Sequence, residues 1–270
     1  MRGPHNIFRL IRTGATLERT GAMNVILDAY NAPWGVRFGA KVLGWPFQWL
    51  GYKGDTTMPP ATRALTALGP AYIKFGQILS TRPDVVGEEL AVQMRVLQDK
   101  LPPFPMADAK QMIEAELEQP LEGLFSEFSE PVAAASIAQV HRGKLISDGS
   151  NVAVKVLRPG IEKAFRRDID AFYFAARMIE TLAPSARRLR PLDVIAHFEG
   201  VVMGELDLRL ESSAAGEFAA NTEADLGFQL PKVNWNLSGK NVMTMDWAEG
   251  ISAGDNAALD AAGHDRRKIG

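Results

Sequence analysis

The sequence predicts an α+β fold in which a helical first half precedes a small antiparallel sheet and a long helix. Three observations support this prediction. Residues up to about 120 show helical spacing of apolar side chains, interrupted by prolines. Two β-leaning runs follow, joined by a turn of small polar residues. Beyond them, apolar residues recur at nearly every fourth position up to Phe218, as on one face of a helix.

The composition is that of an ordinary globular chain, long enough for two compact units. Of 270 residues, 46% are hydrophobic and 23% are charged. No cysteine occurs, so disulfides and thiolate metal sites are excluded. The four histidines are far apart in the sequence and lack the spacing typical of metal ligands. We therefore expect no metal site among the residues of this chain.

Residues 1–60 are predicted to form a basic, aromatic-rich arm. Residues 1–53 contain seven lysines and arginines against two acidic residues, and GVRFGAKVLGWPFQWLGYKG mixes aromatic with basic side chains. This mixture is typical of a segment that lies on an anionic lipid surface. The alternative is that the aromatic side chains dock the arm on the rest of the chain. No stretch is apolar enough to span a bilayer, so we expect peripheral association.

The second predicted unit, residues 61–128, is helical and contains the stretch LGPAYIKFGQILSTRPD. Its predicted helices cover residues 63–79, 87–97 and 107–117. In the first of them, Lys74 lies among apolar residues, where an unpaired ammonium group is costly. Gly76 costs this helix about 1 kcal/mol relative to alanine. We therefore expect a partner for Lys74 outside the helix and a close neighbour at Gly76.

The third predicted unit, residues 129–254, begins with β periodicity. The runs VAAASIAQVHRGKL and NVAVKVL are joined by the turn residues SDGSN. In the second run, the valines at 152, 154 and 156 fall on one face and Lys155 falls on the other. Beyond it, the sequence predicts helices over 165–182 and 194–218, a hairpin turned at Ser238-Gly239, and a connection over 255–270.

The order of these elements is that of a kinase-like N-terminal lobe. A strand, a small-residue loop, a strand, a hairpin, a strand with a central lysine and a long helix with a glutamate follow one another. In such a lobe the lysine contacts nucleotide phosphates and the glutamate holds the lysine. Lys155 in VAVK and Glu211 fit these roles. The alternative is a strand lysine with its ammonium group in water.

The predicted nucleotide loop has alanine where an ordinary kinase has glycine. Alanine disfavours positive φ angles, so this loop should be stiffer and should approach phosphates differently. A tightly packed turn without ligand contacts is the alternative. The candidate nucleotide-binding residues of the loop and its flanks are Val132, Ala133, Ala134, Ala135, Ser136, Ile137, Ala138, Gln139 and Val140.

The segment ELDLRLE, from Glu205 to Glu211, offers carboxylates to two separate cations. On one continuous helix these two side chains would lie about 120° apart, so a single cation could not easily bind both. Lys155 is the candidate partner of Glu211, which leaves Glu205 available to a cation from another segment. The alternative is an exposed Lys74, with Glu205 paired to Arg209 four residues further on.

In combination, LGPAYIKFGQILSTRPD, AAASIAQVH, VAVK and ELDLRLE resemble the UbiB family of atypical protein-kinase-like proteins of ubiquinone biosynthesis, formerly called 2-polyprenylphenol 6-hydroxylases. The resemblance runs from about residue 62 to residue 250. It implies an atypical protein-kinase-like N-terminal lobe, preceded by a helical K-x-G-Q extension that lies over the entrance for a protein substrate. It also implies ATP or ADP with Mg²⁺ as cofactor. The residues that it implies as catalytic are Lys74, Gln77, Glu205 and Asp207, with Lys74 reaching toward Glu205.

The same resemblance implies partners and a location. We expect adenine nucleotide, an anionic membrane surface, and isoprenoid lipid or proteins of ubiquinone biosynthesis as partners, and no nucleic acid. The expected location is peripheral, on the cytoplasmic face of the inner cell membrane. The sequence leaves a homodimer open.

The sequence also departs from the family pattern. It contains no catalytic H-x-D-x-H-P-G-N loop and no later D-F-G in the expected order. We therefore expect the second lobe, with its metal ligands, to be absent from this chain, as in a truncated gene or a natural short form. The function predicted for the family is that of an atypical kinase or ATPase. The alternative is a non-catalytic, membrane-associated module that binds lipid or protein partners.

Overall fold

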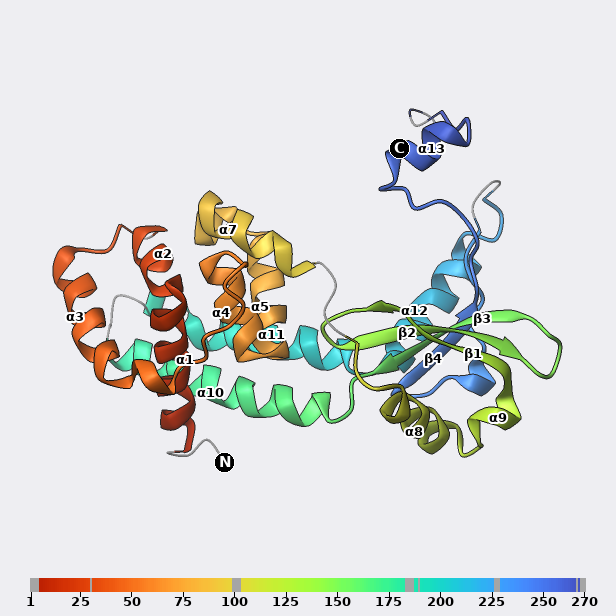
Figure 1. Cartoon of the computed structure of the whole chain (residues 1–270), viewed down its shortest axis with the longest axis horizontal. Helices are drawn as coiled ribbons and strands as arrows, with labels where there is room; N and C mark the ends of the chain where they lie inside the picture. The colour runs from red at the N-terminus through yellow and green to blue at the C-terminus, as the bar shows by residue number, and fades with distance from the viewer. Residues whose placement is uncertain are drawn as a thin grey trace.

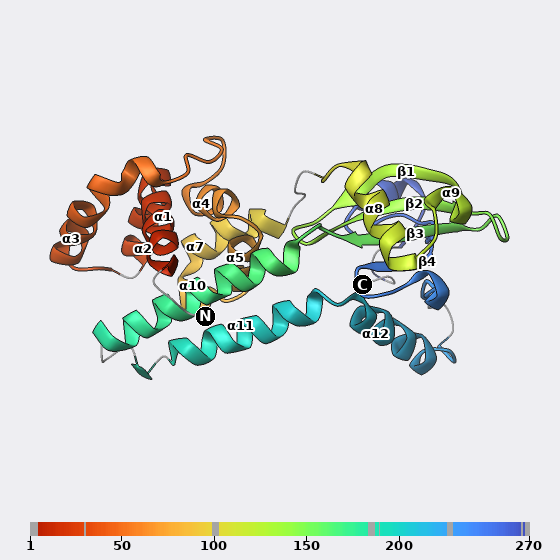
Figure 2. The same cartoon turned by 90° about the horizontal axis from the view of Figure 1, so that it is seen from below.

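The computed structural model describes residues 5–29, 31–98, 103–182, 187–188, 190–225, 229–265 and 267. Helices gather at one end of the molecule and a four-stranded sheet lies at the other (Figure 1). The neighbouring helices α10 (Ile161–Leu182) and α11 (Pro191–Glu205) connect the two ends: α10 leads away from the sheet and α11 returns toward it (Figure 2). The predicted α+β class, an antiparallel sheet with helices, is confirmed.

The described residues 5–29 and 31–50 form a helical arm. Its elements are α1 (His5–Thr20), α2 (Ala22–Ala29), α3 (Trp34–Gly44) and the 3-10 helix η1 (Trp45–Leu50). Helix α1 packs against α4 and α10, and its Arg9 forms an ion pair with Asp168 of α10. Ala15 and Thr16 of α1 are buried against residues 51 and 52, where the Thr16 hydroxyl accepts the Tyr52 N–H at 3.0 Å.

The helical extension follows the arm. Its elements are α4 (Pro60–Leu68), α5 (Pro70–Ser80), α6 (Pro83–Val86), α7 (Glu88–Arg95), η2 (Val96–Gln98), α8 (Met106–Leu117) and α9 (Leu121–Leu124). The single helix predicted over 63–79 is therefore two helices. Gly69, with a φ of 115°, ends α4, and Pro70 begins α5.

The sheet consists of four antiparallel strands in sequential order. They are β1 (Phe125–Ala134), β2 (Ala138–Leu145), β3 (Asn151–Leu157) and β4 (Val242–Asp246). Val152, Val154 and Val156 are buried on the face that α8 covers, which confirms the predicted alternation. Lys155 lies on the other face, directly opposite Val140 of β2 and Met243 of β4.

The hairpin predicted at Ser238-Gly239 forms only in part. Its second arm is β4, but its first arm makes one isolated bridge, between Val233 and Met245, and then turns into the 3-10 helix η4 (Trp235–Leu237). The chain bends there because the Ser238 hydroxyl accepts a hydrogen bond from the Thr244 backbone N–H at 3.0 Å, in place of a strand partner.

The prediction of a single long helix over 194–218 is wrong. The structure has two helices there, α11 and α12 (Leu208–Asn221), with a break at Leu206 and Asp207. Asp207 has an extended backbone, with φ −128° and ψ 94°, and its carboxylate accepts a hydrogen bond from the Arg209 backbone N–H. Asp207 is thus the N-cap of a new helix.

The regular apolar spacing conceals this break. Phe198 and Val202 are buried on α11, as the pattern predicts. On α12, by contrast, Leu210 and Phe218 are 58% and 51% exposed. The pattern therefore describes the buried face of α11 but not that of α12. A short helix, α13 (Asn256–Ala261), lies near the end of the described residues.

Candidate functional site

An ion pair between Lys155 of β3 and Glu211 of α12 forms the centre of the candidate site. The Lys155 ammonium group lies 2.6 and 2.7 Å from the two oxygens of the Glu211 carboxylate. The Lys155 side chain is 25% exposed and that of Glu211 is 45% exposed. The predicted pair is confirmed, and its lysine is both fixed in position and reachable from solvent.

The alanine-rich loop borders this pair. Ala133, Val140 and Lys155 lie opposite one another in register on three adjacent strands. The loop itself is a tightly packed turn, since the Ala135 N–H donates to the Ala138 carbonyl at 2.8 Å and Ser136 is buried. The loop is therefore a packed turn, and it also lies next to Lys155.

Arg158 fixes the loop from the end of β3. Its backbone N–H donates to the Ile137 carbonyl at 2.8 Å, and its guanidinium group donates to the Ala135 carbonyl at 3.2 Å. Partial burial lowers the pKa of the Arg158 guanidinium. The strand that carries Lys155 thus also holds the loop in place.

Gln139, one of the predicted loop residues, directs its side chain elsewhere. It lies opposite Val156 in register and so shares the sheet face that α8 covers. Its side-chain oxygen accepts the Phe104 N–H at 3.0 Å, and its nitrogen lies 2.9 Å from the ring of His141. This side chain joins the helical extension to the sheet and does not face Lys155.

The prediction from sequence missed His141, which is fully buried and completes this polar chain. Its Nδ1 donates to the Ser129 carbonyl at 2.8 Å, so its Nε2 accepts from Gln139. Burial lowers the pKa of His141. The sequence carried a usable signal, because Gln139 and His141 alternate in phase with the buried valines of β3.

A second ion pair joins the helical extension to α11. The Lys74 ammonium group of α5 lies 2.5 Å from the carboxylate of Glu205, the last residue of α11. Phe75 anchors α5 beside it, with its ring centroid 5.5 Å from that of Phe172 and 5.3 Å from that of Phe198. The predicted contact between Lys74 and Glu205 is confirmed.

The other two polar or small positions of the K-x-G-Q stretch serve packing inside the extension. The Gln77 amide donates to the Leu97 carbonyl at 2.7 Å. A Cβ at Gly76 would lie 2.5 Å from a side-chain carbon of Leu65 and 2.6 Å from one of Leu97. Gly76 thus has close neighbours, as the sequence predicts. These neighbours are two leucine side chains of the extension and not residues of the candidate site.

Asp207 pairs with Arg209, which excludes the alternative partner for Glu205. The Arg209 guanidinium donates to both Asp207 oxygens, at 2.8 and 2.6 Å, and holds the pKa of this carboxyl below its usual range. The two lysine–glutamate pairs form as predicted, but the predicted reason is wrong. Glu205 and Glu211 lie on two helices and not on two sides of one.

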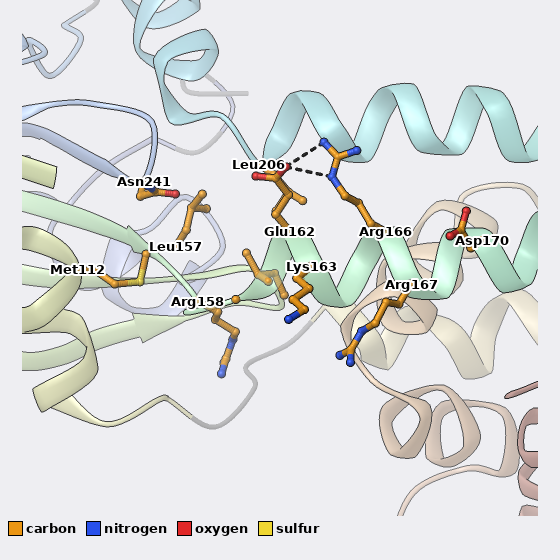
Figure 3. A pocket seen from close by; sticks show the side chains of 12 residues that line it. Met112, Leu157, Arg158, Glu162, Lys163, Arg166, Arg167, Asp170, Leu206 and Asn241 are labelled. Atoms are coloured by element: carbon orange, nitrogen blue, oxygen red, sulfur yellow. Dashed lines mark hydrogen bonds and ion pairs between the residues drawn. The ribbon is translucent and has the colours of Figure 1, made fainter. Parts of the chain in front are cut away.

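The described residues suit a phosphate better than a metal ion. Lys155 is a positioned cation, whereas no three His, Asp or Glu side chains gather closely enough to hold a metal in the described part of the chain. A cavity of about 450 Å³ lies beside the start of α10, where Leu157, Glu162 and Asn241 are among its lining residues (Figure 3). Its described lining does not include Lys155 or Glu211.

Comparisons with known proteins identify the family of the chain. The family model for the ABC1 atypical kinase-like domain matches residues 96–270. A "Probable protein kinase UbiB" of Marinobacter nauticus is 42% identical over 207 residues, which are 76% of this chain and 38% of that protein. Proteins of the same name from Pseudomonas paraeruginosa and Shewanella baltica are 38% identical over 93% and 97% of this chain. The chain spans 47% and 46% of their lengths.

Proposed function

Because this chain belongs to the ABC1 atypical kinase-like family, we propose that it is the nucleotide-binding part of a UbiB-like atypical kinase or ATPase that supports ubiquinone biosynthesis. The observation that carries the proposal is the pair between Lys155 and Glu211 beside the alanine-rich loop. In kinases, a strand lysine held by a helix glutamate binds the phosphates of ATP.

Each residue of the site has a role in this proposal. Lys155 binds phosphate oxygens of ATP or ADP, and Glu211 fixes the direction of its ammonium group. Ala133 and Val140, which lie opposite one another in register beside Lys155, would border the nucleotide. Mg²⁺, when bound with the nucleotide, would neutralise phosphate charge, with ligands other than the described residues.

The K-x-G-Q helix α5 restricts access to the site in this proposal. Its support is the second ion pair, in which the Lys74 side chain is 19% exposed and that of Glu205 is 35% exposed. Breaking this pair would weaken the contact of α5 with the end of α11, while Phe75 still packs against Phe198. A protein, a lipid or water could then receive the phosphoryl group.

Nucleotide binding by the purified 270-residue chain tests the proposal. We expect Mg·ADP to bind with measurable heat in isothermal titration calorimetry, and Lys155→Ala to lose that heat. Lys144→Ala is the matched control, since Lys144 is an exposed lysine of the same sheet, 3.6 Å from Glu127. Equal binding by Lys155→Ala and the wild-type chain would contradict the proposal.

We also propose that the 270-residue chain by itself transfers no phosphoryl group. The reason is that its sequence offers no catalytic carboxylate or metal ligands in the order that phosphoryl transfer requires. Release of phosphate from radiolabelled ATP is the measurement. Mg²⁺-dependent turnover that Lys155→Ala abolishes would contradict this proposal.

The exposed aromatic side chains of the arm support a second candidate function, peripheral membrane binding. Trp34 is 79% exposed, Phe38 62% and Trp49 75%, so these three side chains do not dock the arm on the chain. The basic residues Arg37 and Lys41 lie on the same helix as Trp34. In the described residues, no helix is long and apolar enough to cross a bilayer. Aromatic and cationic side chains together favour an anionic lipid surface.

Vesicle sedimentation tests the second candidate. We expect the chain to bind phosphatidylglycerol-containing vesicles more tightly than neutral phosphatidylcholine vesicles at low salt, and less tightly as salt is added. A double variant, Trp34→Ser with Phe38→Ser, should lose this binding without losing α1 docking. Equal binding to both vesicle types at low salt would contradict the membrane role.

A further inference from the structure

The turn of residues 239–241, which leads into β4, connects the two elements of the candidate nucleotide site. The Lys240 carbonyl accepts a hydrogen bond from the Leu208 N–H at 2.9 Å, at the first residue of α12. The Asn241 carbonyl accepts one from the Leu157 N–H at 3.0 Å, at the end of β3. One short turn thus sets the position of α12 relative to β3.

Glu116 of α8 holds this turn from the other face of the sheet. One of its carboxylate oxygens accepts the Lys240 backbone N–H, and the other accepts the Asn241 side-chain amide at 2.7 Å. The negative charge strengthens both hydrogen bonds. Gly239 leaves room for the carboxylate, because a Cβ there would lie 2.8 Å from the carboxylate carbon of Glu116.

The Lys240 side chain brings the start of α10 into the same junction. Its ammonium group lies 2.7 Å from Glu162, which also accepts hydrogen bonds from Arg166. Asn241, Leu157 and Glu162 line one cavity together, and Figure 3 shows the Glu162–Arg166 contact at its edge. Helices α8, α10 and α12 and strand β3 therefore all meet at one turn.

We propose that Glu116 is a positioning residue for the Lys155–Glu211 pair. Its carboxylate bonds to the turn and not to either member of the pair. Without it, the Lys240 N–H and the Asn241 amide lose their acceptor, and the start of α12 is no longer held at a fixed distance from β3. The part of this inference that concerns nucleotide rests on the proposed function, whereas the effect on the ion pair does not.

Competitive acetylation of the folded chain, read residue by residue by mass spectrometry, measures the pair directly. A lysine held by a carboxylate reacts more slowly than a free one. Glu116→Ala should raise the acetylation rate of Lys155 toward the rate in Glu211→Gln. The matched control is Glu114→Ala, also on α8, whose carboxylate accepts the Leu121 N–H and which should leave Lys155 unchanged. An unchanged Lys155 rate in Glu116→Ala would overturn the proposal.

Gly239→Ala displaces the Glu116 carboxylate without removing it. The backbone of Gly239 has no positive φ that alanine would strain. This variant should raise the Lys155 acetylation rate as Glu116→Ala does. The double variant should be no faster than Glu116→Ala alone, because both changes break the same contact. Additive effects in the double variant would overturn the proposal. A purely structural role would lower the melting temperature and leave the Lys155 rate of the folded chain unchanged.

Titration with Mg·ADP separates this inference from the proposed function. Glu116→Ala should weaken ADP binding about tenfold, the loss expected for hydrogen bonds to a charged group. If the wild-type chain binds ADP and Glu116→Ala binds it equally well, the positioning role is overturned. If the wild-type chain binds no ADP, the proposed function fails, and the acetylation rates still decide whether Glu116 positions the pair.

Discussion

The two lysine–glutamate pairs use the same chemistry to join different parts of the molecule. Lys155 and Glu211 join a strand to a helix beside the sheet, and Lys74 and Glu205 join the helical extension to the end of α11. The first pair is the more exposed of the two. In the proposed function the lysine of the sheet pair binds nucleotide, whereas the extension pair joins two helices.

Exchanging the partners within each pair should separate the two roles most clearly. Lys155→Glu with Glu211→Lys keeps an ion pair but removes the cation from the strand, so Mg·ADP affinity should fall about a hundredfold. Lys74→Glu with Glu205→Lys should leave ADP affinity within about twofold. Calorimetric titration of both double variants is the measurement. A similar loss of ADP affinity in both would mean that the two pairs form one binding site.

Packing at Gly76 should affect the helical extension more than the sheet. Gly76→Ala places a methyl group against Leu65 and Leu97, and such overpacking costs about 1 to 3 kcal/mol in the free energy of unfolding. Gly123→Ala in α9 is the control, because its Cβ would meet no atom within 4 Å. Chemical denaturation measures both variants. A Gly76→Ala chain as stable as Gly123→Ala would show that α5 is not tightly packed.

We expect the stability of the chain to depend on pH because of His141, a buried residue of the sheet. Burial lowers the pKa of His141 in the folded state, so the folded chain binds this proton less readily than the unfolded chain does. Stability is then full above the unfolded pKa, about 6.5, and falls as pH decreases below it, by at most about 1.4 kcal/mol per pH unit.

Denaturation at pH 7.5 and 5.5 tests this dependence. His141→Gln should be less stable at pH 7.5 but should lose less stability between the two pH values. His197→Gln, an exposed position on α11, should keep the dependence of the wild-type chain. Identical pH dependence in all three proteins would exclude His141 as its source.

The sequence was sufficient to predict features that show in a short stretch of residues or in the order of the elements. The alternation of valines placed Lys155 on the correct face of β3, and its pairing with Glu211 followed from the order of the kinase-like elements. The need of Lys74 for a partner was predictable because an unpaired ammonium group among apolar residues is costly, and the resemblance to the family then pointed to Glu205.

Three features of the structure were not predictable: the break at Asp207, the hydrogen bonds of Glu116 and the incomplete hairpin. The break at Asp207 was hidden because apolar spacing continues through it, although Leu210 beyond it is exposed. Glu116 is separated along the sequence from its two hydrogen-bond partners, Lys240 and Asn241, by 124 and 125 positions. No periodic pattern in the sequence indicates such a contact. The first arm of the expected hairpin failed because the Ser238 hydroxyl takes a backbone partner.

The extended residue Asp207 also affects the direction of Glu211. In one unbroken helix, each residue inserted before Glu211 would turn its carboxylate by about 100° and carry it away from Lys155. A single extended residue interrupts that rotation, so the direction of Glu211 is set where α12 begins and not by the turns of α11. At that start, the Leu208 N–H donates to the Lys240 carbonyl at 2.9 Å, and the turn that leads into β4 thereby directs Glu211 toward Lys155.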